Sequence, residues 1–402
     1  MSAYEARLAR LALRDPRKIP SMLRLKLGRR DEWRRDLSGE GAAAVAPPFV
    51  VAIRMSYACN LRCVMCNQWG EEGVFVKTPD RLVRREMTTD ELKRFIDDIA
   101  GFKPFVYFTG GEPLMSPDIL EIVRHASSRH LVTSMSTNGT FLKEKTDGLI
   151  EAGLDYLYTS LDAPVALAKD AIRVTAKGGD STQEAAEAIK HLIRRRDELG
   201  VGLPIVQTQT IVVRENQHLL LDMARFVQDE LGSDLWGLQL CVFTTPELNA
   251  ATTRSYQASF GQDQVGWAGF IRDFPGMDFE RLEEQLRAIL NGRWRFKLRA
   301  YKPLGMKGFS LRDYYTRPER FATDEPLTCM NPYVFAQLQP NGDVAFCGSQ
   351  PDYTIGNVKD ARFMDLWRGE RAARWRRFLQ KQLFASCARC FSLHEFDHFR
   401  AR

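Results

Sequence analysis

The sequence predicts an α/β fold built on a parallel sheet, and two observations support this prediction. Between residues 49 and 245, six apolar strand-like runs alternate with segments of helical periodicity. Most of these runs are followed at once by a short polar motif, as at the carboxyl edge of a parallel sheet. Repeated strand–helix units make right-handed crossovers, so we expect one sheet covered by helices.

Each element can be placed in chain order. The expected strands span residues 49–56, 105–110, 131–139, 156–162, 207–216 and 235–243. Helices are expected near residues 87–100, 116–126, 143–153, 181–199 and 218–231. The sequence marks where the first helix begins, because Thr88 and Glu91 have the spacing of a capping box. The second is marked by Ser116-Pro117, since proline favours the first helical position.

Composition restricts the class of protein. The chain has 402 residues, of which 44% are hydrophobic and 27% charged, as in ordinary globular proteins. We find no apolar run of about 18 residues and no apolar signal-peptide core, so neither a transmembrane segment nor secretion is expected. We therefore expect a cytoplasmic location, where thiols stay reduced. Reduced thiols make the eight cysteines candidate metal ligands. No nucleic-acid-binding module is evident.

Three cysteines, Cys59, Cys63 and Cys66, fall within the stretch YACNLRCVMCNQW. A structural zinc ion takes four ligands, and no histidine lies near this loop. An iron–sulfur cube held by only three thiolates keeps one iron open to a substrate or cofactor. The spacing alone leaves a flexible zinc loop or a chance cluster as alternatives.

The motifs at the strand ends identify a family. The spacing Cys59-x3-Cys63-x2-Cys66 resembles the signature loop of radical S-adenosylmethionine (SAM) enzymes, although Met65 stands where that family usually has an aromatic residue. Further motifs typical of the family follow the second to fifth strands over a resemblance spanning roughly residues 49–245. These motifs are GGEP at 110–113, STNG at 136–139, SLD at 160–162 and VVREN at 212–216.

The resemblance implies a partial (β/α)6 TIM-like barrel and a [4Fe–4S] cluster whose open iron chelates SAM. In this family the reduced cluster cleaves SAM to a 5′-deoxyadenosyl radical, which abstracts hydrogen from a substrate. An electron donor such as flavodoxin or ferredoxin is implied. The resemblance carries SAM contacts over to Gly110, Gly111, Glu112, Pro113, Ser136, Asn138, Ser160, Arg173 and Asn216.

These assignments have structural alternatives. Gly110 and Gly111 would let the backbone approach SAM closely, or they form an ordinary turn. Glu112 would pair with SAM or be a solvated turn carboxylate. Arg173, in the segment KDAIR, would hold the SAM carboxylate or form a surface salt bridge. Ser136, like Asn138, would bind ribose or carboxylate oxygens or act as a turn former.

Four further cysteines form a second group. Pro340 to Asp343 predict a hairpin turn that brings Cys329 and Cys347 together, and the later CARC supplies Cys387 and Cys390. Four thiols make a closed site, which suits structural zinc or an iron–sulfur cluster equally.

The region resembles the C-terminal extension called SPASM, or its shorter form, twitch. The pattern Cys-x12-Gly-x4-Cys and the later GNV and LW fit it. A full SPASM domain has three further cysteines and two auxiliary clusters, and this chain lacks those thiols after Cys390. The resemblance therefore implies a small α+β domain with one auxiliary [4Fe–4S] cluster. His394 and His398 are expected as surface residues, with an unusual cluster ligand as the alternative.

The remaining cysteine, Cys241, is expected on the sixth strand near the barrel mouth. It is a candidate catalytic residue, because in one class of radical SAM reaction, epimerisation, a cysteine returns hydrogen to the substrate radical. The simpler interpretation, which we favour, is a small buried hydrophobe.

The expected domains are a basic N-terminal arm and linker (1–48), the radical SAM barrel (49–245), a bridging segment (246–325) and the SPASM/twitch domain (326–402). The arm is expected to pack on its own domain, with contact to a membrane or an acidic partner as the alternative. The residues of the bridging segment that could line the substrate cavity are Tyr256, Trp267, Phe309 and Tyr314, although for each of them we favour a packing role.

Taken together, the sequence predicts an oxidoreductase or epimerase that dehydrogenates or epimerises a sugar- or alcohol-like small molecule. One alternative is a peptide maturase that cross-links or oxidises a precursor peptide. The other is a metal-binding scaffold without catalytic activity.

Overall fold

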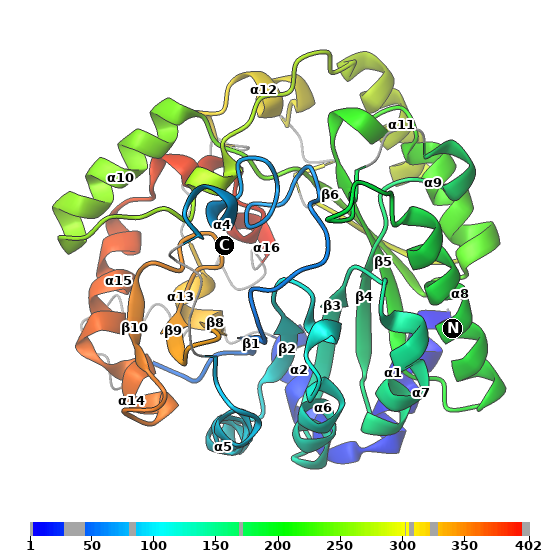
Figure 1. The fold of residues 1–402 in the computed structure, drawn as a ribbon, viewed down its shortest axis with the longest axis horizontal. Helices are drawn as coiled ribbons and strands as arrows, with labels where there is room; N and C mark the ends of the chain where they lie inside the picture. The colour runs from blue at the N-terminus through cyan, green and yellow to red at the C-terminus, as the bar shows by residue number, and fades with distance from the viewer. Residues whose placement is uncertain are drawn as a thin grey trace.

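The computed structural model describes residues 3–27, 45–79, 86–168, 172–301, 303–304, 309–321 and 329–395. Within these residues one ten-stranded sheet has the order β10-β9-β8-β1-β2-β3-β4-β5-β6-β7. The sheet curves into an open barrel with helices on its outer side (Figure 1). The predicted α/β fold with a partial TIM-like barrel and a small C-terminal domain is confirmed.

All six predicted strands form, and each pairs in parallel with the next. They end earlier than expected, because the polar motifs leave the sheet and turn over its carboxyl edge. The strands are β1 (Val50–Arg54), β2 (Phe105–Thr109), β3 (Val132–Thr137), β4 (Tyr156–Ser160), β5 (Ile205–Val212) and β6 (Leu235–Leu240).

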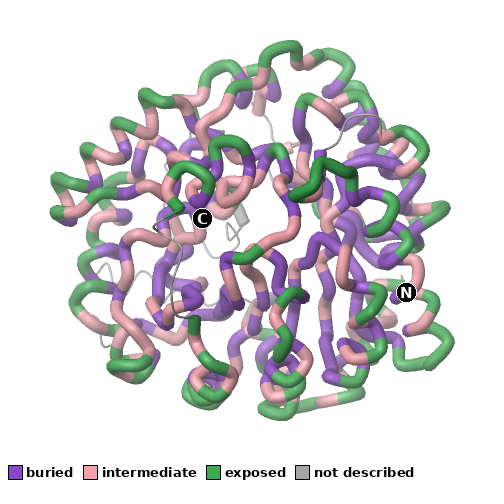
Figure 2. Tube along the Cα trace, in the orientation of Figure 1, coloured by how far each residue is buried: buried purple, intermediate pink, exposed green. Residues whose placement is uncertain are grey.

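Amphipathic helices cover the outer face of these strands, and Figure 2 shows buried strands inside a ring of helices with exposed outer sides. They are α5 (Thr89–Ile99), α6 (Ile119–Ser128), α7 (Leu142–Ala152), α8 (Thr182–Glu198) and α9 (Leu220–Phe226). The predicted capping box of Thr88 and Glu91 is present at α5. The predicted start of α6 is wrong: a 3-10 turn at Pro113–Met115 comes first, and the helix begins after Asp118.

Two parallel strands extend the barrel beyond the six that were predicted. Strand β7 (Lys297–Ala300), in the bridging segment, pairs with β6. Strand β8 (Phe335–Leu338) pairs with β1. The second cysteine group is therefore attached to the same sheet as the first.

The C-terminal region contains the predicted hairpin, formed by β8 and β9 (Asp343–Ala345). Gly342 in its turn has φ +97°, a conformation that favours glycine. The remaining elements of this region are α13 (Asn331–Val334), β10 (Thr354–Asn357), α14 (Phe363–Arg368), α15 (Glu370–Lys381) and α16 (Ser392–Glu395).

The cysteine loop after β1 leads into a short helix, and the bridging segment contains three helices. These are α4 (Val74–Lys77), α10 (Pro246–Phe260), α11 (Phe279–Asn291) and α12 (Leu311–Thr316). In the described part of the chain, no helix is both long and apolar enough to cross a membrane.

The N-terminal arm packs on the barrel, as expected, through α1 (Ala3–Arg14) and α2 (Ile19–Leu27). Leu11 is fully buried with residues of β5 and β6. Lys18 Nζ lies 2.6 Å from the buried carboxylate of Asp155, which precedes β4. The arm therefore covers the amino edge of the sheet, opposite the motifs, while most of the predicted linker lies outside the described residues.

A buried charge cluster fastens this arm. Asp234 accepts hydrogen bonds from Arg7 Nε (2.5 Å), from Arg196 Nη1 (2.7 Å) and from the amide of Val206 (2.9 Å). Arg196 is fully buried. Asp197 contacts the same two arginines, but half of its side chain is exposed.

We expect Asp234→Ala to lower the free energy of unfolding by about 3–5 kcal/mol, because it removes the buried carboxylate of the cluster and leaves Arg196 paired only with the half-exposed Asp197. The matched control, Asp197→Ala, should cost less than about 1 kcal/mol, since solvent screens that pair. Chemical denaturation followed by circular dichroism measures both. Equal losses in the two variants would contradict this interpretation of the cluster.

Candidate active site

The cysteine loop and the GGEP motif lie against each other at the carboxyl edge of the sheet. The amide of Gly111 donates to Ser56 O (2.9 Å), and that of Glu112 to Ala58 O (2.8 Å). A Cβ atom on Gly111 would lie 2.1 Å from Ala58 O, and one on Gly110 would lie 2.6 Å from Ser56 O. From the sequence, the backbone at these glycines is expected to approach SAM closely. In the structure this backbone approaches the cysteine loop closely, and the approach requires both glycines.

The cysteine loop directs amide groups at its own sulfurs. Cys59 Sγ accepts from the amide of Leu61, and Cys66 Sγ from the amides of Gln68 and Trp69, each at 3.4 Å. Such donors stabilise thiolate ligands. Burial nevertheless raises the pKa of Cys63 to about 12, so the free side chain is a neutral thiol.

Glu112 is buried and joins the second and third motifs. Its Oε1 accepts from the Leu114 amide (3.0 Å) and the Thr137 hydroxyl (2.7 Å), and its Oε2 accepts from the Asn138 amide (2.7 Å). Burial raises the pKa of Glu112 to about 7 despite these three donors. The alternative of a solvated turn carboxylate is therefore wrong. Pro113 begins the turn that Glu112 caps.

The third motif is anchored beside the cysteine loop. Asn138 Nδ2 donates to Asn60 Oδ1 (2.9 Å) and lies 4.0 Å from Cys59 Sγ. Ser136 Oγ accepts from the hydroxyl of Tyr107 at 2.7 Å. Ser160 is half-buried at the end of β4.

Arg173 lies in a buried ion pair next to the cysteine loop. Its Nε is 2.7 Å from Asp162 Oδ2, and its Nη1 is 3.8 Å from Cys63 Sγ. Burial raises the pKa of Asp162, although the charge of Arg173 opposes that change. The alternative of a surface salt bridge is therefore wrong, since the pair is buried and the guanidinium faces a cysteine ligand position.

Asn216 is fully buried, and its side chain binds backbone groups of the chain itself. Its Nδ2 donates to Asp162 O (3.0 Å) and Ile211 O (2.9 Å), and its Oδ1 accepts from the Val213 amide (2.8 Å). Both donor hydrogens are used. The side chain therefore holds the turn after β5 together, and it has no donor hydrogen left for SAM.

Cys241 is the first residue after β6 rather than part of it. It is 1% exposed and packs in one apolar cluster with Leu61, Cys63 and Met65 of the cysteine loop. Arg272 Nη1 lies 3.8 Å from its sulfur. Burial raises the pKa of Cys241 to about 11. Met65 contributes apolar packing here in place of the usual aromatic residue.

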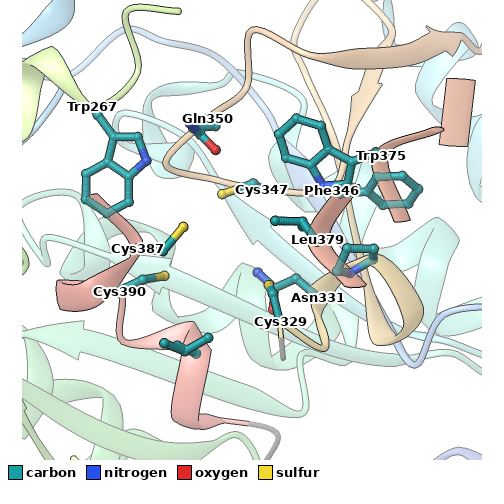
Figure 3. A pocket seen from close by; sticks show the side chains of 12 residues that line it. Trp267, Cys329, Asn331, Phe346, Cys347, Gln350, Trp375, Leu379, Cys387 and Cys390 are labelled. Carbon is teal, nitrogen blue, oxygen red and sulfur yellow. The ribbon is translucent and has the colours of Figure 1, made fainter. Parts of the chain in front are cut away.

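The four C-terminal cysteines line one cavity (Figure 3). Cys329 precedes α13, Cys347 follows β9, and the other two flank Arg389 before α16. Burial raises the pKa of Cys347, Cys387 and Cys390, so the free thiols are protonated. The other lining residues are Trp267, Asn331, Pro332, Phe346, Gln350, Trp375, Leu379 and Leu393.

Four thiols that line one cavity are enough to hold an iron–sulfur cube or a zinc ion. Within the described ranges, no three His, Cys, Asp or Glu side chains are already arranged around one metal-ion position. The possible ligand role of His394 and His398 stays a prediction, since neither side chain is among those described.

The aromatic residues of the bridging segment are mostly packed. Tyr256 is fully buried and packs against Trp375 of α15, with ring centroids 6.0 Å apart, in agreement with the favoured expectation of packing. Trp267 lines the cavity of the four cysteines. The hydroxyl of Tyr314 donates to Cys241 O (3.0 Å), and Phe309 packs against Tyr314.

Sequence reasoning missed Asn60, Asp162 and Arg272 as residues of this site. Asn60 is adjacent to Cys59, and Asp162 ends the SLD motif, so both were marked by the motifs themselves. Arg272 had no such signal, because it lies in an irregular part of the bridging segment.

Two protein-family models match the chain: the radical SAM superfamily over residues 53–227, and SPASM, an iron–sulfur cluster-binding domain, over residues 329–391. A Pyrococcus furiosus protein named tungsten-containing aldehyde ferredoxin oxidoreductase cofactor-modifying protein is 26% identical over 352 residues, covering 84% of this chain and 86% of that protein. The AdoMet-dependent heme synthase of Oleidesulfovibrio alaskensis is 24% identical over 335 residues, covering 79% and 74%.

Among solved structures, SuiB of Streptococcus suis has the same fold. Its crystal structure bound to S-adenosylmethionine has a TM-score of 0.57 at 14% identity and covers 86% of this chain and 72% of SuiB. The structure bound to the precursor peptide SuiA has a TM-score of 0.56 at 14% identity, covering 84% and 68%.

Proposed function

The chain belongs to the radical SAM superfamily and ends in a SPASM domain, and from this premise we propose that it oxidises a small hydroxyl-bearing substrate. Its cofactors are SAM, a [4Fe–4S] cluster and an auxiliary iron–sulfur cluster. When bound, they supply the electron and the 5′-deoxyadenosyl radical that starts the reaction. Membership makes the chain an enzyme, so the scaffold alternative is not retained.

In this proposal Cys59, Cys63 and Cys66 hold the first cluster, and the predicted SAM-binding residues other than Asn216 orient SAM. The guanidinium of Arg173, beside Cys63, offers a cation for the SAM carboxylate. Oε2 of Glu112 accepts one hydrogen bond, from the Asn138 amide, and keeps capacity for a donor from SAM. Asn138, next to Cys59, would bind polar SAM atoms. The contacts of Gly110, Gly111, Pro113, Ser136 and Ser160 stay predictions from the family motifs.

The inner face of the barrel favours a polar substrate. Along β5, Val206 packs with the helices, so Gln207 and Gln209 face the interior, where their amides bond to each other at 2.8 Å. Gln339 accepts from the Tyr57 hydroxyl (2.9 Å) and from Arg54 Nη1 (3.3 Å). Amides, hydroxyls and a guanidinium can exchange these bonds for hydroxyl groups of a sugar-like molecule.

One observation carries the choice of oxidation over epimerisation. Four cysteines line the C-terminal cavity, which is enough to ligate every iron of one cube. A cube closed in this way has no iron to bind substrate, and it can accept an electron. Held by the four cysteines, the cluster would accept one electron from the substrate radical. Oxidation would then balance, with one hydrogen atom lost to the 5′-deoxyadenosyl radical and one proton lost to solvent.

A peptide substrate is the second candidate, and the likeness to SuiB with its precursor peptide favours it. At 14% identity that likeness concerns the fold. Two relatives that match most of the chain are named as a cofactor-modifying protein and a heme synthase, which favours a small molecule.

Deuterium transfer tests the proposed substrate class. The reduced holoenzyme is incubated with SAM and a metabolite extract from cells grown in deuterated medium, separated into a small-molecule fraction and a peptide fraction. We expect deuterated 5′-deoxyadenosine only with the small-molecule fraction, and treatment of that fraction with a sugar-oxidising reagent should abolish it. Deuterium arriving only from the peptide fraction would replace the proposal with a peptide maturase.

A further inference from the structure

The cavity of the four C-terminal cysteines contains unpartnered hydrogen-bond donors. In the described part of the chain, Nε1 of Trp267, Nε1 of Trp375 and Nε2 of Gln350 are buried and form no hydrogen bond. All three side chains line this cavity. A buried donor without an acceptor costs about 1–3 kcal/mol, and native proteins rarely retain one. Three at one cavity indicate an acceptor inside it.

The buried, unpartnered Oδ1 of Asn331 is the exception at this cavity, because it is an acceptor. Rotation about its last side-chain bond would turn the NH2 group of the same amide to that position. The cavity can thus present donors from four side chains. An iron–sulfur cube, whose sulfurs are all acceptors, has the matching chemistry.

Trp267 is the donor whose position is fixed most firmly. The amides of Val265 and Gly266 donate to Asp352 Oδ2 (3.2 and 3.0 Å), and the Trp267 amide donates to Gln264 Oε1 (3.2 Å). A Cβ atom on Gly266 would lie 2.3 Å from Ser349 O, so this turn touches the loop after Cys347.

The indole of Trp267 faces the cysteines. The ring is 1% exposed. Figure 3 shows its nitrogen-bearing edge turned toward the side where the sulfurs of Cys347 and Cys387 lie. A residue of the bridging segment, outside the predicted SPASM domain, is thus placed to contact the auxiliary cluster.

We propose that the Trp267 indole N–H donates a hydrogen bond to a sulfur of the auxiliary cluster and thereby raises its reduction potential. Reduction adds negative charge to the cluster, and a hydrogen bond to sulfur stabilises that charge. The hydrogen bond therefore favours the reduced form. Through this hydrogen bond, Trp267 makes the auxiliary cluster a better electron acceptor.

The test is Trp267→Phe in the full-length holoenzyme, which removes the N–H and keeps an aromatic ring. An EPR-monitored redox titration follows the signal that SAM addition does not change, which belongs to the auxiliary cluster. We expect the reduced-to-oxidised ratio at a fixed potential to fall roughly tenfold, equivalent to about 59 mV for one electron.

Trp367→Phe is the matched control. Trp367 is fully buried in the same C-terminal region, but its Nε1 donates to Ala46 O at 2.9 Å, and it does not line the cavity. Its replacement should leave the potential of the auxiliary cluster unchanged. If Trp267 has a purely structural role, neither variant should change the potential of the auxiliary cluster. That result would overturn the proposal.

A measurement on the wild-type protein does not depend on correct folding of a variant. Wild-type holoenzyme labelled with ¹⁵N at the indole nitrogens should show a ¹⁵N hyperfine coupling on the reduced auxiliary cluster. Trp267→Phe should weaken or remove this coupling, while Trp367→Phe should retain it. The absence of any indole coupling in the wild type would exclude the proposed hydrogen bond.

Discussion

Cys63→Ala is expected to abolish formation of 5′-deoxyadenosine from SAM, while Cys387→Ala leaves it measurable. Cys63 belongs to the loop with three cysteines, where loss of one thiol leaves two protein ligands and no stable cluster. SAM then has neither an electron source nor its binding iron. Cys387 lines the separate C-terminal cavity. Its loss should impair product formation, because the substrate radical lacks its electron acceptor.

Iron analysis is the control for this pair of variants. Wild-type protein reconstituted without oxygen should hold about eight irons, as two cubes, and each variant about four. Chromatography of the reaction after reduction with dithionite measures 5′-deoxyadenosine. Normal SAM cleavage by Cys63→Ala would refute the assignment of the first cluster. Four irons and one zinc in the wild type would refute the auxiliary cluster.

The product of the proposed reaction, made in deuterated water, should be two mass units lighter than its substrate and carry no deuterium on carbon. Oxidation removes two hydrogens and returns none. Cys241→Ala should remain active, because Cys241 is 1% exposed and packs beneath the cysteine loop beside Cys63 and Met65. A buried sulfur of this kind is poorly placed to return hydrogen to a substrate.

Mass spectrometry of the product distinguishes the two fates of the substrate radical. An epimerase would return one hydrogen from an exchangeable thiol, so its product would gain one deuterium. That result, together with loss of turnover in Cys241→Ala and normal SAM cleavage, would establish epimerisation and make Cys241 catalytic.

The sequence predicted the elements whose signals are local. The six barrel strands are apolar runs between helical segments, and the motifs mark their carboxyl ends. Strand β7 was missed because its residues alternate between exposed and half-buried, with Lys297 and Arg299 on the exposed side, so it has no apolar run. Proline favours the first helical position, so Pro113 and Pro117 both indicate the start of a helix. Pro113 begins a 3-10 turn instead, and the start of α6 was misplaced for this reason.

The candidate site was predictable where one motif specified it and unpredictable where two distant segments meet. The three cysteines of the first site were identified by their spacing together with the motifs that follow the strands. The side chain of Asn216 was assigned to SAM because a motif does not show that its hydrogens already bind Asp162 O and Ile211 O. The position of Trp267 beside the C-terminal cysteines was not predicted, since nothing in its local sequence reveals that Gly266 touches Ser349.

The pairing of β1 with β8 has a consequence for biosynthesis of the protein. Val50 is in register with Phe335, so the first barrel strand to leave the ribosome waits for a partner made almost three hundred residues later. At roughly 5–20 residues per second, one edge of β1 stays open for on the order of 15–60 s. An open strand edge templates aggregation. The nascent chain therefore passes through a period in which chaperone protection of β1 matters most, and that period ends only when β8 emerges.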